Sequence, residues 1–89
     1  TLQSPMPTPT SGAFEVSWSL PTSGAARLTL WDAAGRQLRT LFEGELNAGW
    51  SQRAFTLTDD AGRGLPNGVY WLRLEQGRER ASQKVILSK

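Results

Sequence analysis

The segment AFEVSWSL, Ala13–Leu20, decides the fold class because its apolar and polar side chains alternate strictly. From position 14 to position 20, every even residue is apolar and every odd residue is polar. A period of two is typical of a β-strand with one face buried and the other in water. The stretch therefore predicts a half-buried strand that directs four side chains into a core: Phe14, Val16, Trp18 and Leu20.

Similar patterns recur along the chain and predict an all-β fold. We expect further strands over residues 25–32, 51–58, 69–76 and 81–89, and a less regular one around Leu38, Leu41 and Phe42. Turn sequences separate them, and no stretch has the helical apolar period. Evenly spaced short strands of this kind indicate an immunoglobulin- or fibronectin III-like antiparallel β-sandwich of six or seven strands. Its expected core comprises Phe14, Val16, Trp18, Leu28, Leu30, Phe55, Tyr70, Leu72 and Leu74.

The first twelve residues differ from the rest in composition. TLQSPMPTPTSG is rich in Pro, Thr and Ser, and prolines at positions 5, 7 and 9 keep the backbone extended. We interpret residues 1–12 as a linker or lead-in arm and residues 13–89 as the sandwich. A chain that starts at Thr1 without a basic-then-apolar leader is expected to be a piece of a larger protein.

Length and composition exclude several classes of protein. The 89 residues, 38% apolar and 20% charged, are those of one globular domain, which we expect to be monomeric in isolation. No apolar run approaches the roughly 18 residues that span a bilayer, so a membrane-spanning protein is not expected. The basic residues form no compact run and no nucleic-acid motif, which argues against nucleic-acid binding.

Catalytic chemistry has little support in the sequence. The chain has no cysteine and no histidine, which removes the thiolate nucleophile and the usual near-neutral acid–base group. DDAG, residues 59–62, is followed by Arg63 and Leu65 and so predicts an Asx-type turn rather than a calcium loop. We expect no enzyme activity, cofactor, metal ion or small-molecule substrate.

Aromatic and basic side chains leave alternatives open. Tyr70 follows LPNG, which resembles the tyrosine corner of sandwich domains, although a plain core tyrosine fits as well. Trp31 and Trp71 fall on outward faces, where they are either covered by neighbours or exposed for binding sugars or proteins. The last 17 residues carry five basic and two acidic groups, a local charge of +3. That charge fits a solvated hairpin or a docking surface for an acidic partner.

Five short motifs, in order and at matching spacings, resemble one family. The chain is similar to the type A C-terminal sorting domains of the type IX secretion system, although Thr8 stands where the family usually has asparagine. Part of the pattern, mainly residues 26–41 and 59–75, also resembles the immunoglobulin-like domain of flagellar hook-capping proteins. The similarity is carried by Pro7, Pro9 and Gly12; by Trp31, Asp32, Gly35 and Arg36; by NAGW at 47–50; by Gly68 and Tyr70; and by Lys84 and Val85.

The resemblance implies a non-catalytic secretion signal that takes a larger cargo through the periplasm and across the outer membrane to cell-surface attachment. Its implied partners are the translocon, shuttle and sortase proteins of that system. A final strand at a sheet edge, flanked by lysines, would offer unpaired backbone groups and positive charge to them. The alternative is a carbohydrate-binding module, through Trp31, Trp50 or Trp71, or a structural immunoglobulin-like module of a secreted enzyme. The implied recognition residues are Pro7, Pro9, Gly12, Gly68, Tyr70, Lys84, Val85 and Lys89, with Trp31 and Trp71 as candidate exposed aromatics.

Overall fold

The structure, a computed structural model, describes residues 2–10, 13–56 and 58–87, with only the backbone described at positions 9 and 10. The described residues form seven strands and no helix. The bounds of the strands are Met6–Thr10 (β1), Ala13–Leu20 (β2), Gly24–Asp32 (β3), Gln37–Leu46 (β4), Gly49–Thr56 (β5), Gly68–Gln76 (β6) and Glu79–Leu87 (β7).

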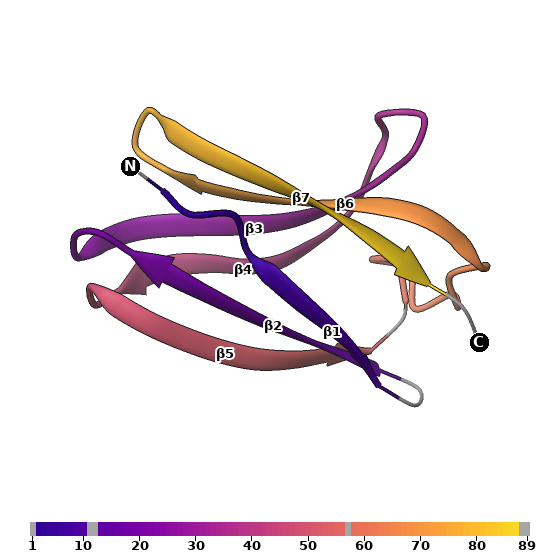
Figure 1. The fold of residues 1–89 in the computed structure, drawn as a ribbon. Helices are drawn as coiled ribbons and strands as arrows, with labels where there is room; N and C mark the ends of the chain where they lie inside the picture. Colours follow the sequence, from indigo (N-terminus) through magenta and orange to yellow (C-terminus); the bar gives the residue numbers. More distant parts are fainter. Residues whose placement is uncertain (1, 11–12, 57, 88–89) are drawn as a thin grey trace.

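The strands form two sheets packed face to face, as Figure 1 shows. The smaller sheet has the order β1-β2-β5 and the larger one the order β4-β3-β6-β7, with every neighbouring pair antiparallel. The edge strands β1 and β7 lie on one side of the sandwich (Figure 1), where they contact one another. The predicted all-β antiparallel sandwich is confirmed.

Part of the N-terminal arm is itself a strand. β1 pairs with β2 so that Pro7 lies opposite Val16 and the backbone of Pro9 lies opposite Phe14. Proline has no backbone N–H to donate to a neighbouring strand. It is tolerated here because β1 is an edge strand, which pairs with only one of the described strands. Leu2 and Pro5, which precede β1, are both buried, so the arm contributes to the core.

The core lies between the sheets and contains every residue that the alternation predicted for it. All nine predicted core side chains are buried, from 0% exposed at Val16, Leu28 and Leu72 to 8% at Phe55. Aromatic rings also contact one another within the sandwich. The Phe14 and Phe55 ring centroids are 5.9 Å apart, and those of Trp18 and Phe42 are 6.3 Å apart.

The irregular pattern of β4 has a structural cause. Its pairing with β3 shifts register twice, once past Leu41 and once past Leu38. Each shift is a β-bulge, in which one strand contributes an extra residue and the strict alternation of faces is interrupted. Leu41 is buried and Leu38 packs against the core, so the two bulges allow closely spaced leucines to share one side of the strand.

The first prediction tests the centre of the larger sheet. Leu30 and Leu72 are direct partners on β3 and β6, and both are buried. Leu72→Ala should lower the free energy of unfolding by about 2–5 kcal/mol, because it removes buried methyl groups and leaves a cavity. Urea unfolding followed by tryptophan fluorescence measures the change. Val69→Ala, at a 38% exposed position of the same strand, is the control. Equal effects of the two substitutions would contradict this assignment of the core.

Candidate functional site

The outer face of the larger sheet carries a row of side chains across three strands. Trp31 on β3 pairs with Trp71 on β6, which in turn pairs with Lys84 on β7. Directly opposed residues of antiparallel strands project from the same face. The register therefore places both tryptophans and the lysine side by side on the surface that points away from the core.

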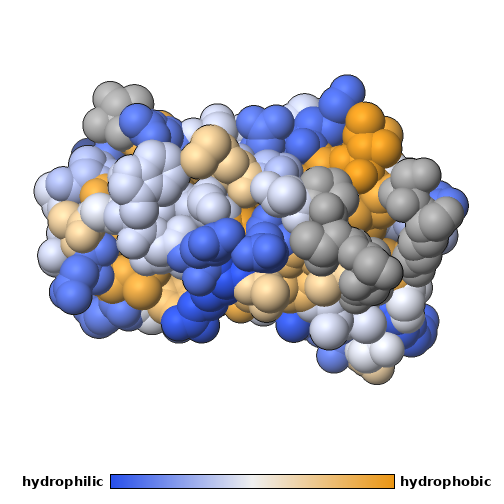
Figure 2. All heavy atoms as spheres, turned by 60° about the horizontal axis from the view of Figure 1, so that its bottom comes forward, coloured by the Kyte–Doolittle hydropathy of each residue, from blue (hydrophilic) through white to orange (hydrophobic). Residues whose placement is uncertain are grey.

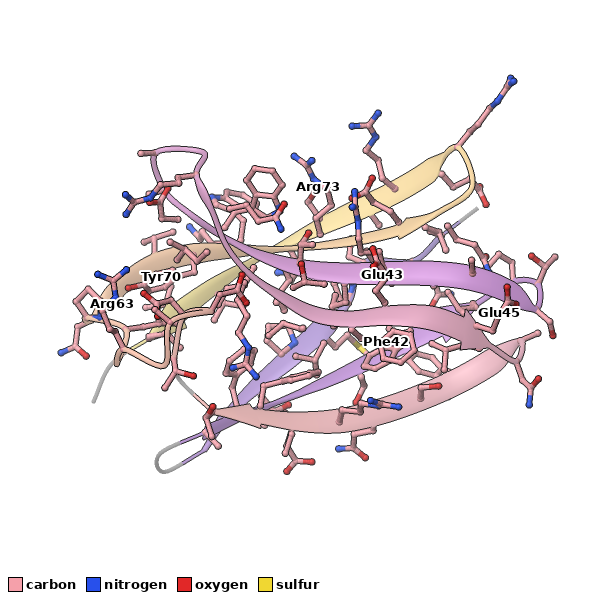
Figure 3. All side chains as sticks on the ribbon, turned by 180° about the vertical axis from the view of Figure 1, so that it is seen from behind. Phe42, Glu43, Glu45, Arg63, Tyr70 and Arg73 are labelled. Atoms are coloured by element: carbon pink, nitrogen blue, oxygen red, sulfur yellow. The ribbon has the colours of Figure 1, made fainter. Side chains whose placement is uncertain are left out.

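Trp31 is half-buried because its neighbours cover it. The Arg73 guanidinium lies 4.4 Å from the centroid of the Trp31 ring, which is a cation–π contact. The Trp31 indole N–H donates a 2.9 Å hydrogen bond to the Thr29 hydroxyl. Thr29 lies on the same outer face of β3, two residues before Trp31, but it is fully buried there. Figure 3 shows Arg73 projecting away from the smaller sheet.

A hollow of about 360 Å³ opens on this face beside the aromatic row. Its floor includes Trp71, Arg73 and Ser82, and one wall is formed by the turn after β3. In Figure 1 the β3–β4 hairpin rises above the plane of the larger sheet, which explains why a flat strand surface is hollowed here. Trp71 is 41% exposed and is therefore the accessible aromatic residue of the pair.

Tyr70 lies at the same end of the molecule but points inward. Its side chain is buried, and its hydroxyl donates a 2.6 Å hydrogen bond to the Pro66 carbonyl, four residues upstream. This confirms the tyrosine corner. Burial, with a smaller contribution from the Asp32 carboxylate, raises the pKa of the Tyr70 hydroxyl above its ordinary value of 10.0. Both Tyr70 and its β7 partner Val85 are buried, so neither side chain is open to contact from outside.

Two turns of nearly identical sequence, DAAGR at 32–36 and DDAGR at 59–63, close this end of the sandwich. In each, one carboxylate oxygen accepts hydrogen bonds from two backbone N–H groups. For Asp32 these belong to Ala34 and Arg36, at 3.0 and 2.9 Å. For Asp59 they belong to Ala61 and Arg63, both at 3.0 Å, which confirms the predicted Asx-type turn.

The electrostatics of the two turns follow from these bonds. Backbone N–H donation from the fifth residue of each turn, assisted by the charge of its arginine, lowers the pKa of both Asp32 and Asp59 below the ordinary value of 3.8. The carboxylates are engaged within their own turns, and Figure 3 shows Arg63 and Tyr70 at this same end. Within the described part of the chain, no group of three or more acidic side chains is arranged to hold a metal ion.

The structure brings some of the predicted recognition residues together and separates others. Gly68 begins β6 opposite Leu87. Its φ is +156°, a backbone conformation that residues other than glycine rarely adopt. Together with Tyr70, Lys84 and Val85 it lies on the β6–β7 hairpin, and of these only the Lys84 side chain is clearly exposed. Pro7 lies on the other sheet, Pro9 is described only by its backbone, and Gly12 and Lys89 fall outside the described residues.

Two exposed side chains of this hairpin were not singled out from the sequence. Val69 and Ile86 are direct partners on β6 and β7, and they are 38% and 58% exposed. The alternation placed Val69 on the outward face. It did not indicate that an apolar partner would lie uncovered beside it, because pairing register is not visible in one sequence.

Comparison with known proteins relates the chain to a protein family and to a solved structure. A model of the family described as "Secretion system C-terminal sorting domain" matches residues 6–88. The solved structure of FLGD from P. aeruginosa has a TM-score of 0.71 at 19% sequence identity, and the match covers 94% of this chain and 64% of that one. At this identity the likeness shows the fold alone. No curated protein matches the chain. The described residues include no helix of the length and apolarity that crossing a membrane requires.

The second prediction concerns the tyrosine corner. Tyr70→Phe removes the hydrogen bond to Pro66 and should cost about 1 kcal/mol of stability near neutral pH. Since the folded-state pKa of Tyr70 is raised above 10.0, the contribution of its hydroxyl to stability is complete below pH 10 and is lost as pH rises from there through the higher folded-state pKa. Thermal unfolding between pH 7 and about 11 should show the two proteins converging at the alkaline end. A difference that grows with pH would contradict this account.

The third prediction concerns the twin turns. Because the pKa values of Asp32 and Asp59 are depressed, their contributions are present above pH 3.8 and are lost as pH falls through the folded-state values. The double variant Asp32→Asn/Asp59→Asn should melt lower than the wild type at pH 6, and the gap should close near pH 2. Asp60→Asn is the control. The two hydrogen bonds within this turn are accepted by the carboxylate of Asp59 and not by that of its neighbour Asp60. A difference in melting temperature that persists at pH 2 would show that the stabilisation does not come from the charged carboxylates.

Proposed function

The chain belongs to the secretion system C-terminal sorting domain family, and from this premise we propose that it directs a larger cargo protein to attachment at the cell surface. Family membership makes the domain a sorting signal for type IX secretion, which components of the secretion machinery read. The cargo is then a secreted or cell-surface protein. The proposal adds transit through the periplasm, crossing of the outer membrane and retention on the surface.

The observation that carries the proposal is the extent of the family match. It runs over residues 6–88 and so includes every strand from β1 to β7. The signal is therefore a folded domain and not a short peptide tail. The last strand supports this view, because Val85 and Leu87 are 2% and 3% exposed and belong to the core. A partner that reads β7 in the folded state has access to Lys84 and Ile86 but not to those two side chains.

The position of β7 provides a route for recognition. It is an edge strand that pairs with β6 on one side, and no other described strand pairs with it. Edge strands carry backbone donors and acceptors that a partner chain can extend by strand addition. Lys84 adds an exposed positive charge to this strand, which favours acidic surfaces and speeds encounter with them.

We treat the domain as non-catalytic. The sequence offers no histidine or cysteine, and the two carboxylates with lowered pKa values are bonded within their own turns. The carbohydrate-binding alternative has weaker support from the geometry. Sugar platforms use open aromatic faces, whereas Arg73 covers one face of the Trp31 ring and Thr29 occupies its indole N–H.

The fourth prediction tests the sorting function. The chain is fused behind a signal peptide and a reporter protein in a bacterium that has a type IX system, and the reporter is measured in medium, surface and periplasmic fractions. The full fusion should reach the surface or the medium. Removal of residues 1–89 should leave the reporter in the periplasm, and export without these residues would exclude the proposal.

Point variants separate recognition from stability. Lys84→Ala and Lys89→Ala should change the free energy of unfolding by no more than about 0.5 kcal/mol, since Lys84 is exposed and its ammonium group forms no ion pair among the described residues. The double variant should nevertheless retain reporter in the periplasm. Val85→Asp should both retain the reporter and unfold the domain, because it buries an unpaired charge.

A further inference from the structure

Three exposed apolar side chains lie together on the outer face of the β6–β7 hairpin. Val69, Trp71 and Ile86 are 38%, 41% and 58% exposed, and with Lys84 they form what we call the hairpin strip. Val69 is paired directly with Ile86, and Trp71 with Lys84, so the two pairs are successive rows of one face. Outward positions of a solvated sheet are usually polar, and a contiguous apolar group there marks an interaction site.

The opposite face of the molecule makes a useful contrast. Outward positions of β2 are polar at Glu15, Ser17 and Ser19. Figure 2, which turns this side forward, shows hydrophilic and neutral residues over most of the surface, with apolar areas scattered and small except toward one end. Trp50 on β5 is 64% exposed, but its direct partner is Ser19 and not another apolar residue.

The charged side chains on the strand segments of the hairpin strip are all basic. The hollow beside the strip also has Asp32 in its lining, but that carboxylate is held within its own turn and lies 3.3 Å from the Arg36 guanidinium. Residues 69–73 and 82–86 include Arg73 and Lys84 but no acidic residue. Among the described residues, no carboxylate forms an ion pair with either side chain, and Arg73 instead stacks on Trp31. Elsewhere on the same sheet, acidic groups do pair, since Arg27 lies 3.2 Å from Glu75 and 3.8 Å from Glu43. The strip and its border thus combine apolar surface with two cations that form no ion pair with a carboxylate among the described residues.

The hollow beside Trp71 provides a pocket next to this surface. It adjoins the strip at Trp71 and is also lined by Arg73, and its volume of about 360 Å³ has room for an apolar side chain of a partner. Binding energy at protein interfaces concentrates where such an anchor enters a pocket with charged groups at its rim. Aliphatic Val69 and Ile86 extend the surface on the other side of Trp71, which suits the apolar side chains of a protein better than the hydroxyl-rich ring of a sugar.

We propose that the hairpin strip is the docking surface for an acidic protein segment that places an aromatic or aliphatic anchor in the hollow and carboxylates against Lys84 and Arg73. The proposal rests on the sorting function, since it assigns the face through which the secretion machinery reads the domain. It assigns roles to Val69, Ile86 and Arg73 beyond the recognition residues that the family resemblance implies. It also predicts that recognition weakens with salt, because the charged contacts lie at an exposed rim.

The first test uses a defined probe and the purified 89-residue chain labelled with ¹⁵N. The probe is the acetylated and amidated pentapeptide Glu-Glu-Phe-Glu-Glu, compared with versions in which lysine replaces glutamate or serine replaces phenylalanine. We expect saturable chemical-shift changes at Trp71, Lys84 and Ile86 with the first peptide, and at least a 10-fold weaker Kd with the other two. Equal binding of all three, or shifts confined to other strands, would overturn the proposal.

Matched variants locate the effect. Trp71→Thr, Ile86→Thr and Lys84→Glu should each raise the Kd at least about 5-fold. Trp50→Thr removes a tryptophan that is more exposed, at 64% against 41% for Trp71, from the other sheet. Arg78→Glu makes the same change of charge in the β6–β7 turn, about 20 Å from Lys84. Both controls should bind as the wild type does. Saturable binding of an oligogalacturonate, with none of the acidic peptide up to about 10 mM, would assign the strip to sugars instead and overturn the proposal.

Export of the reporter fusion separates this proposal from the one on which it rests. Trp71→Thr/Ile86→Thr should lower the exported fraction at least 10-fold, while Trp50→Thr and Arg78→Glu leave it unchanged. Normal export of the strip variant would overturn the docking surface and leave the sorting function standing. A wild-type fusion that stays in the periplasm would contradict the sorting function. The peptide titration would then decide by itself whether the hairpin strip binds an acidic segment.

Discussion

The register between β3 and β6 is the constraint on which both the core and the surface depend. Leu28, Leu30, Leu72 and Leu74 pair across these strands and point inward, while Trp31 pairs with Trp71 and points outward. Because side chains alternate with a period of two, a slip of one residue would exchange the two faces. The leucines would then be exposed and the tryptophans and Arg73 would be buried. The burial of the leucines therefore determines which side chains reach a partner.

The end of the sandwich near Tyr70 is closed by turns and by the connection between β5 and β6, and hydrogen bonds hold these segments in place. The twin turns at 32–36 and 59–63 lie together there and line one hollow with Tyr70. The backbone N–H of Asp60 donates to the Leu38 carbonyl, and the Arg39 guanidinium donates to the side chains and carbonyls of Thr56 and Thr58. These bonds tie the connection between β5 and β6 to β4. In a small domain with a thin core, such ties fix the start of β6 and thereby the position of Trp71.

The sequence predicted the fold well because the alternation of apolar and polar residues follows directly from the burial of one face of each strand. The alternation in β2 and β6 indicated both the strands and the residues that point into the core. Three features needed the structure. β1 is rich in proline and becomes a strand only because it lies at an edge; β4 conceals its strand pattern behind two bulges; and Thr29 is buried on an outward face by Trp31 and Arg73. Each depends on a neighbour distant in sequence, which periodicity cannot reveal.

The candidate site was less predictable for the same reason. Trp31, Trp71, Tyr70 and Lys84 were recognisable as residues of interest, but their roles diverge once burial is known. Tyr70 and Val85 hold the hairpin to the core, whereas Lys84 and Ile86, their sequence neighbours on β7, reach the surface. Val69 and Ile86 look ordinary in the sequence, 17 positions apart, and become adjacent only through the pairing of β6 with β7. A single sequence shows the residues of such a surface but not the surface itself.

This arrangement makes recognition depend on folding. Trp71 and Lys84 are 13 positions apart in the sequence but are direct partners in the folded hairpin. An unfolded chain would have to close that loop and order both side chains at an entropic cost before it could present the same row. A partner that requires the row and the adjacent hollow therefore selects the folded domain. β7 contributes Val85 and Leu87 to the core and Lys84 and Ile86 to the strip, so loss of core packing along β7 also removes the proposed docking surface.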